Sequence, residues 1–332
     1  MLYMENSSKY FEKEDIVVDL NEDEIGTELL EILLKDRTTG NNIIWATDTY
    51  SILGDKYSFF SPILIESITN EHNFVIRPRH KKEMEEQKTR SRDKAEVFTP
   101  AWLCNRQNNL IDREWFGREN IFNQETAFGW TVNTDKVSFP KGKTWKQYVT
   151  EERLEITCGE APYLVSRFDV TSGQKIPVNE RVGLLDRKLR VVSENTPDER
   201  TKANIRQWRR WALRAIMSTY GFEWQGDSLL LAREAVLWTY IEHYMQKWGV
   251  PPKRDALLKV SEVISWNLWQ MDGITMGIPG YEIDEELPRP NLLFKPNEAS
   301  NPNTRLCRIK EWTSIEPLAG NEIIFKSMVD KQ

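Results

Sequence analysis

The sequence predicts an α/β protein with a largely helical C-terminal half. Two short runs of β-forming residues, RLEIT at 153–157 and RVGLLD at 181–186, are each followed by a polar turn, which is how strands of a parallel sheet end. From residue 204 onward the chain holds three long segments whose apolar residues recur at helical spacing. Strands that lead into helices in this way are typical of a doubly wound sheet.

The composition fits a chain that can bury a core without disulfide bonds or structural metals. It has 332 residues, of which 39% are hydrophobic and 29% charged, and a mean hydropathy of -0.58. No run of 18 apolar residues indicates a membrane helix, and the first residues do not resemble a secretory signal. The 3 cysteines lie far apart, so they predict neither a zinc site nor a disulfide framework. We therefore expect a cytoplasmic protein without metal.

The net charge of -6 is unevenly distributed. Residues 1–36 carry 11 acidic and 3 basic side chains, so the rest of the chain is slightly basic. Residues 77–94 hold eight basic and four acidic side chains and predict an exposed linker. We divide the chain into an acidic N-terminal arm with a basic linker (1–94), a core with a helical part (95–273) and a C-terminal tail with short strands (274–332).

Helices and strands can be predicted in order along the chain. Residues 25–36 predict an amphipathic helix, and NNIIWATDTY at 41–50 predicts a buried strand. Phe98-Thr99-Pro100 predicts a helix start, because proline is favoured in the first turn. The tail predicts two short strands, RLCRIKEW and NEIIFKSM. Three helices are each predicted to end at a glycine, and they cover 204–221, 229–249 and 255–273.

Common catalytic motifs are missing from the sequence, which has no GxSxG, Walker A, GxGxxG or HExxH pattern. Instead, the first predicted strand runs into Cys158-Gly159-Glu160 and the second ends at Asp186. In a doubly wound sheet, a small residue after the first strand lets the backbone approach a ligand. An acid at the end of the second strand accepts hydrogen bonds from ribose hydroxyls. This pattern indicates a nucleoside-containing cofactor.

The segments VFTP at 97–100 and ITCGEAPYL at 156–164 resemble the start of N6-adenine DNA methyltransferases. In that family an F/Y-T-P motif precedes a glycine-containing loop that binds S-adenosylmethionine. The run 95–273 is similar to proteins of the "restriction endonuclease subunit M" type, on segments such as GLLDRKLRVV and STYGFEWQGDSLLLARE. The resemblance extends over about 29–315. It implies a Rossmann-like methyltransferase core, double-stranded DNA as substrate, and a restriction or specificity subunit as partner in a prokaryotic or phage-encoded system.

The resemblance also implies roles for particular residues. The methionine end of the cofactor would contact Phe98, Thr99 and Pro100. The cofactor loop would be formed by Thr157, Cys158, Gly159 and Glu160. Asp186 would accept hydrogen bonds from the ribose, and Asp227 would hold the adenine amino group. Each segment also fits a purely structural role, as a helix start, a strand-to-helix turn or a helix cap.

Two departures from the family pattern concern the cofactor loop and the catalytic motif. Ala161 or Pro162 stands where the usual loop has a second glycine, and no D/N-P-P-Y/F/W tetrapeptide occurs. In the family that tetrapeptide accepts the hydrogens of the target amino group and stacks on the flipped base. Asn267 and Trp269 are the nearest candidates, although they also fit the end of a helix. The sequence thus predicts an adenine-N6 DNA methyltransferase or a catalytically silent DNA-binding or scaffold subunit.

A nuclease is a further alternative. Asp186-Arg187-Lys188 matches the D-x-K end of a PD-(D/E)xK core, with Asp169 upstream as a second carboxylate for Mg²⁺.

Nucleic-acid contact is predicted by one basic helix. Residues 181–214 carry ten basic and four acidic side chains. The arginines that recur at helical spacing would face phosphates, with Trp208 and Trp211 packed behind them or stacked on a base. They are Arg206, Arg209, Arg210 and Arg214. A solvated helix face over a hydrophobic core explains the same pattern.

Overall fold

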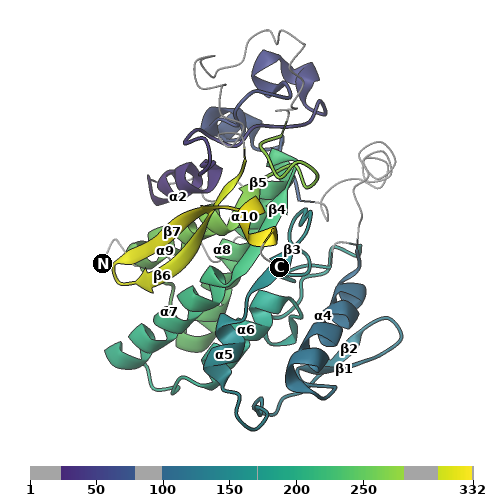
Figure 1. The fold of residues 1–332 in the computed structure, drawn as a ribbon, viewed down its shortest axis with the longest axis vertical. Helices are drawn as coiled ribbons and strands as arrows, with labels where there is room; N and C mark the ends of the chain where they lie inside the picture. The colour runs from purple at the N-terminus through teal and green to yellow at the C-terminus, as the bar shows by residue number, and fades with distance from the viewer. Residues whose placement is uncertain (1–23, 79–98, 170, 280–305, 331–332) are drawn as a thin grey trace.

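The computed structural model describes residues 24–78, 99–169, 171–279 and 306–330 (Figure 1). Its centre is a parallel sheet of three strands in the order β3-β4-β5. These strands are β3 (Arg153–Glu155), β4 (Thr219–Glu223) and β5 (Leu268–Gln270). Two antiparallel hairpins join β1 (Asn123–Glu125) to β2 (Trp130–Val132) and β6 (Arg308–Ile315) to β7 (Leu318–Ile324). The fold is mixed α/β with a parallel sheet, as predicted.

Helices surround this sheet. They are α2 (Glu24–Leu34), α4 (Ala101–Phe116), α5 (Trp145–Thr150), α6 (Leu184–Glu194), α7 (Lys202–Met217), α8 (Gly226–Trp248), α9 (Arg254–Asn267) and α10 (Lys326–Val329). Local signals set several ends. Thr144 and Gln147 form a capping box before α5, and Gly249 ends α8 in a left-handed conformation with φ 66°. None of the described helices has the length and hydropathy that crossing a membrane requires.

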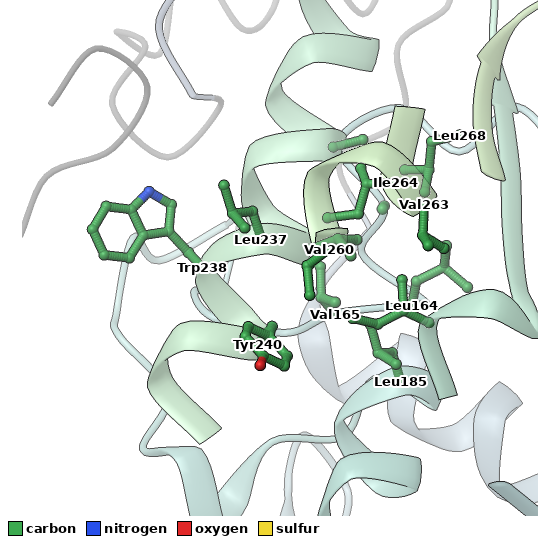
Figure 2. Packing of buried hydrophobic residues seen from close by; sticks show 14 of the residues in the cluster. Leu164, Val165, Leu185, Leu237, Trp238, Tyr240, Val260, Val263, Ile264 and Leu268 are labelled. Carbon is green, nitrogen blue, oxygen red and sulfur yellow. The ribbon is translucent and has the colours of Figure 1, made fainter. Parts of the chain in front are cut away.

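The central helix is α8, whose side chains are buried on all sides rather than on one face. Such a helix lies inside the core, since every face must contact other elements. Figure 2 shows part of this core: Leu237 of α8, Val260 and Ile264 of α9, and Leu164 and Leu185 from the segments that follow β3. The sequence between β3 and β5 thus builds the helical layer on which the sheet rests.

The two faces of the sheet pack against different parts of the chain because side chains alternate along a strand. Leu268 belongs to the large core that the helices share. Its neighbour Trp269 faces the other way, together with Phe222 on β4, and both pack against Ile309 and Phe325 from the C-terminal hairpin region. The C-terminal strands therefore cover one face of β4 and β5. The sequence predicted both strands with shifted bounds, and the end of the predicted NEIIFKSM strand forms α10 instead.

The strand predicted at 181–186 is wrong. The chain enters α6 at Leu184, directly after Gly183, and the apolar positions Leu185, Leu189 and Val192 all point into the core. A short apolar run gives too few residues to distinguish period 2 from period 3.6, so its periodicity did not separate a strand from a buried helix.

The predicted helix ends at glycine were correct at 249 and wrong at the other two positions. α7 ends at Met217, and Gly221 lies inside β4, where an added Cβ would stand 3.2 Å from Cys158 Sγ. α9 ends at Asn267 and passes directly into β5. The predicted strand at 41–50 is also wrong, since that segment makes only isolated bridges, among them Ile44 with Pro62.

Candidate functional site

The carboxyl ends of the three parallel strands meet at one edge of the sheet (Figure 1). β3 leads there into the loop 156–164, β4 ends at Glu223, and β5 ends at Gln270. Ligands of open α/β sheets bind outside this edge, because the loops between strands and helices gather there. We call this region the carboxyl edge.

The loop after β3 turns tightly at the carboxyl edge. Thr157, Gly159 and Ala161 have positive φ angles of 49°, 54° and 61°. Thr157 and Ala161 are not glycines, so each adopts this left-handed conformation at a free-energy cost on the order of 1 kcal/mol. Such residues persist where the surrounding structure holds them, and they are concentrated at functional sites.

Two carboxylates hold this loop through its backbone. Glu155 accepts hydrogen bonds from the backbone N–H groups of Tyr163 at 3.3 Å and Leu164 at 3.2 Å. Glu223, at the end of the neighbouring strand, accepts from the N–H of Gly159 at 2.8 Å and from that of Gln225 at 3.2 Å. Both carboxylates are nearly buried, so these charge-assisted bonds fix the loop firmly.

Cys158 lies beneath the loop rather than on its surface. Its backbone N–H donates to the Phe222 carbonyl at 2.8 Å. Its thiol packs against Gly221, where the lack of a side chain leaves room for it. Burial raises the pKa of the Cys158 thiol well above its usual value, and the charges of Glu155 and Glu223 raise it further. A neutral, buried thiol is a structural group and not a nucleophile.

The predicted F-T-P segment lies against this same loop. Phe98 is outside the described residues. Asn108 of α4, the helix that follows Thr99 and Pro100, donates to the Tyr163 carbonyl at 2.9 Å. Pro100 directly precedes α4, as predicted. The hydrogen bond from Asn108 holds α4 against the loop 156–164.

Asp186 does not take part in the carboxyl edge, and the predicted ribose contact at this residue is wrong. It lies in the first turn of α6 and is almost fully buried. Its carboxylate accepts from the Ser166 backbone N–H at 2.9 Å and lies 3.1 Å from Nε2 of His243. The Arg181 guanidinium lies 4.0 Å away. This carboxylate joins α6 to α8 inside the core, where no ribose can reach it.

Asp227 also has a structural role inside the protein core. It lies in the first turn of α8, is fully buried, and accepts a hydrogen bond from the Tyr50 hydroxyl at 2.7 Å. An adenine amino group would have to displace Tyr50 from the interior, so the predicted adenine contact does not fit this geometry.

The two predicted catalytic residues are both buried. Asn267 Nδ2 lies within 3.0 Å of the carbonyl oxygens of Ile216, Met217 and Thr219, and Asn267 Oδ1 accepts from Trp312 Nε1 at 2.7 Å. The Trp269 ring is 1% exposed. Neither residue can meet a flipped base, so the prediction that they form the amino-group site is wrong.

The nuclease alternative fails on Lys188. Its side chain is buried, and its ammonium donates to the carbonyl oxygens of Glu151 at 2.5 Å and Ser218 at 3.0 Å. Burial lowers the pKa of this lysine well below its usual value. Asp169, the second carboxylate of that hypothesis, accepts from the backbone of Ala101 at 2.8 Å. Among the described residues, no group of three or more His, Cys, Asp or Glu side chains has the arrangement of a metal site.

The predicted DNA-facing arginines lie along α7, where acidic side chains already contact two of them. Arg206 pairs with Glu316 at 3.0 Å and Arg209 with Asp255 at 2.7 Å. The Arg214 guanidinium lies over the Trp211 ring, whereas Trp208 is fully buried and cannot stack on a base. Arg210 and Arg206 are exposed and remain the accessible cations of this face.

Glu223 is the functional candidate that the sequence prediction missed. The predicted helix at 204–221 included residues 219–221, yet the segment TYGFE at 219–223 forms β4 and ends in an acid shortly before α8. The signal that identifies it is the order of residue types: a short β-forming run, then an acid, then the helix that starts at Gly226 and Asp227. The sequence analysis assigned this order to residues 181–186, which lead into α6 and do not form a strand.

Comparisons with family models, with curated proteins and with solved structures found no match to this chain. Two surface cavities of about 610 and 640 Å³ lie away from the carboxyl edge, on the outer side of α4 around Leu110 and beside the end of α6 around Asn195. The carboxyl edge is the stronger candidate, because it combines acids, a strained loop and the ends of parallel strands, whereas these cavities do not.

Proposed function

We propose that the protein binds S-adenosylmethionine at the carboxyl edge and acts as a DNA adenine-N6 methyltransferase. The observation that carries the proposal is the hydrogen bond of 2.8 Å between the Gly159 N–H and the Glu223 carboxylate. It joins a glycine after one parallel strand to an acid at the end of the next, which is the arrangement that receives a nucleoside in doubly wound folds. The hydrogen bond from Asn108 of α4, the helix that Thr99 and Pro100 precede, to the Tyr163 carbonyl supports the same reading.

In this proposal Glu223 takes the role that the sequence assigned to Asp186. Its carboxylate accepts from the backbone of Gly159 and Gln225, and ribose hydroxyls would offer the same kind of donor at the same place. Thr157, Gly159 and Glu160 form the loop beside the cofactor, and Thr99 and Pro100 lie toward its methionine end. The bound cofactor supplies an activated methyl group, and the protein's part is to orient it.

A second candidate function is a catalytically silent subunit that keeps this fold and binds DNA or serves as a scaffold. The burial of Asn267 and Trp269 favours it, because the amide and aromatic pair predicted for a flipped adenine is then inaccessible. In this version another chain, such as a restriction or specificity subunit, supplies the amino-group site on double-stranded DNA.

Calorimetric titration with S-adenosylmethionine tests the cofactor site. We expect the wild type to bind, and Glu223→Gln to weaken binding by roughly tenfold or more, since a hydrogen bond to a charged group contributes about 1.5–3 kcal/mol. Glu322→Gln, which removes an exposed acid on β7, should bind like the wild type. Asp186→Asn should lower thermal stability and leave the affinity of the folded protein unchanged. No heat of binding by the wild type refutes the proposal.

Transfer of a labelled methyl group to duplex DNA separates the two candidates. Incorporation into adenine that Glu223→Gln reduces supports the active enzyme. Cofactor binding without incorporation, on duplexes that contain all short sequence contexts, supports the silent subunit.

A further inference from the structure

A segment from the N-terminal part of the chain is built into the carboxyl edge. The Ile44 backbone N–H donates to Gln270 Oε1 at 2.9 Å, and Gln270 Nε2 donates back to the Ile44 carbonyl at 2.8 Å. The Gly226 N–H donates to the Trp45 carbonyl at 3.0 Å. A Cβ on residue 226 would overlap the Ile44 carbonyl oxygen, so only glycine lets the segment lie this close.

The segment around Ile44 is hydrogen-bonded to a second segment, residues 59–61. The Ala46 N–H donates to the Phe59 carbonyl at 2.8 Å, and the Trp45 N–H donates to the Ser61 carbonyl at 3.1 Å. Residues 59–61 are thereby held against the strand ends, although more than 150 residues separate them from β4 in the sequence. In Figure 1 this N-terminal part lies at the end of the molecule toward which β4 and β5 point.

The two segments place aromatic rings against Trp224, the residue that follows the acid of the candidate site. Trp224 directly follows Glu223, and its indole N–H donates to the Ala46 carbonyl at 2.9 Å, which fixes the ring. The Phe59 ring meets the Trp224 ring edge to face, with centroids 6.2 Å apart. The Phe60 ring lies 4.8 Å from that of Phe59 and is 46% exposed. We call Phe59, Phe60 and Trp224 the aromatic wall.

An exposed ring that is joined through Phe59 to Trp224, at the end of the strand that carries Glu223, suits one kind of ligand. A flat base stacks on aromatic faces, and the sugar attached to it offers hydroxyls to a carboxylate. An apolar partner peptide would cover Phe60 equally well, but it would gain nothing from the acid at the end of β4. The combination of ring and acid therefore favours a nucleoside over a protein segment.

We infer that the aromatic wall receives the purine of an adenosine-containing ligand, with Phe60 as the stacking residue that the N-terminal part of the chain contributes. This inference rests on the proposed function and deepens it, because the cofactor site would then be lined by residues from two distant parts of the chain. The adenosine moiety is shared by S-adenosylmethionine and ATP, so both serve as probes.

Titrations of the full chain with S-adenosylmethionine, ATP and adenosine test the inference. We expect Phe60→Ala to weaken binding of the adenosine-containing probe by tenfold or more, as loss of one base-stacking ring does. Phe60→Trp should retain binding because it keeps a flat ring. Phe74→Ala, which removes another exposed phenylalanine (54%) of the N-terminal part, should bind like the wild type.

The outcomes separate this inference from the proposed function. If S-adenosylmethionine binds the wild type and Phe60→Ala with equal affinity, the inference is overturned and the cofactor proposal stands. If ATP and adenosine bind, depend on Phe60, and S-adenosylmethionine does not bind, the aromatic wall stands and the methyltransferase proposal falls. If no probe binds the wild type, both are overturned.

Discussion

Asn267 closes a contact between a helix end and the sheet. Its Nδ2 faces the carbonyl oxygens of Ile216 and Met217 at the end of α7, where a helix leaves its last carbonyl groups without intrahelical partners. Its Oδ1 accepts from Trp312 on β6. One amide therefore joins α7, α9 and the C-terminal hairpin, which explains an asparagine in this otherwise apolar segment without any catalytic role.

Replacing Asn267 tests this structural role. We expect Asn267→Ala to lower the free energy of unfolding by roughly 2–4 kcal/mol, since it leaves several buried carbonyl groups and one indole N–H without partners. Urea unfolding followed by circular dichroism measures the change, and Asn321→Ala on the exposed side of β7 is the control. A loss below about 0.5 kcal/mol, the range of ordinary surface substitutions, would contradict the role.

Glu242 gives the protein a predictable acid sensitivity. Burial of this carboxyl opposes its ionisation, but hydrogen bonds and charges from Arg167 and Arg181 outweigh burial and lower its pKa to about 2, below the usual 4.5. A carboxyl whose pKa is lower in the folded than in the unfolded state stabilises the protein at pH values above its unfolded-state pKa. This stabilisation is lost as the pH falls through the folded-state pKa. We expect a loss on the order of 3 kcal/mol between about pH 4.5 and 2.

Thermal melts across this pH range measure the effect, with Glu242→Gln as the comparison. The variant should be less stable at pH 7, by roughly 3–5 kcal/mol, because Arg167 and Arg181 keep their buried charges and lose the carboxylate that both contact. Its melting temperature should depend less on pH between 4.5 and 2 than that of the wild type. Parallel pH profiles would exclude Glu242 as the cause.

The contrast between Asp186 and Glu223 shows what residue-level prediction lacked. Both acids follow a short apolar run and a glycine, so local sequence treats them alike. The structure distinguishes them because Asp186 lies in α6, whereas Glu223 ends β4. Glu155 of β3 pairs with Gly221 of β4, which puts Glu223 at the same edge as the loop 156–164. Register is a long-range property, and residue type alone does not determine it.

At the scale of elements, long segments with a clear end were predicted best. The helix at 229–249 was correct because it is long and ends at a glycine, and the two tail strands were located to within a few residues. Short segments of the core failed, as at 41–50 and 181–186. β5 has only three residues and continues directly from α9, so tertiary pairing with β4, rather than local propensity, makes it a strand.

Gly226 tests whether the N-terminal segment is an integral part of the carboxyl edge. We expect Gly226→Ala to destabilise the protein by roughly 2–4 kcal/mol, because its Cβ would force Ile44 away from the strand ends. Gly249→Ala is the matched control: open space surrounds that position, and only its left-handed φ of 66° opposes alanine, at about 1 kcal/mol.

The two glycine variants also differ in ligand binding. If the proposed cofactor site uses the aromatic wall, Gly226→Ala should weaken S-adenosylmethionine binding and Gly249→Ala should not. Equal losses of stability in urea unfolding would show that the Ile44 contact is not a special constraint.

On the scale of the whole molecule, charge placement governs any contact with DNA. The chain has a net charge of -6, and the exposed Arg206 on α7 is paired with Glu316, itself exposed and outside that helix. Arg206 lowers the pKa of Glu316, so this acid stays charged and opposes phosphate binding at neutral pH. If α7 contacts duplex DNA as proposed, Glu316 restrains the affinity.

Glu316→Gln should therefore raise the affinity for duplex DNA by about two- to fivefold at low salt, while Arg206→Ala lowers it. The logarithmic salt slope should fall in magnitude by about 0.9 in Arg206→Ala, as for loss of one phosphate contact. Fluorescence anisotropy of a labelled duplex over a salt series measures both. Unchanged affinity in both variants would place DNA binding, if found, on another face.

The hydrogen bonds between Ile44 and Gln270 also bear on how the protein matures. They join residues 226 positions apart in the chain, so the carboxyl edge cannot be complete until the ribosome has released β5. Contacts of such long sequence separation form slowly, because a large loop must close first. Ligand binding at this edge would then report a chain that has been synthesised and folded at least through β5, and translation products that stop before β5 would not compete for the ligand.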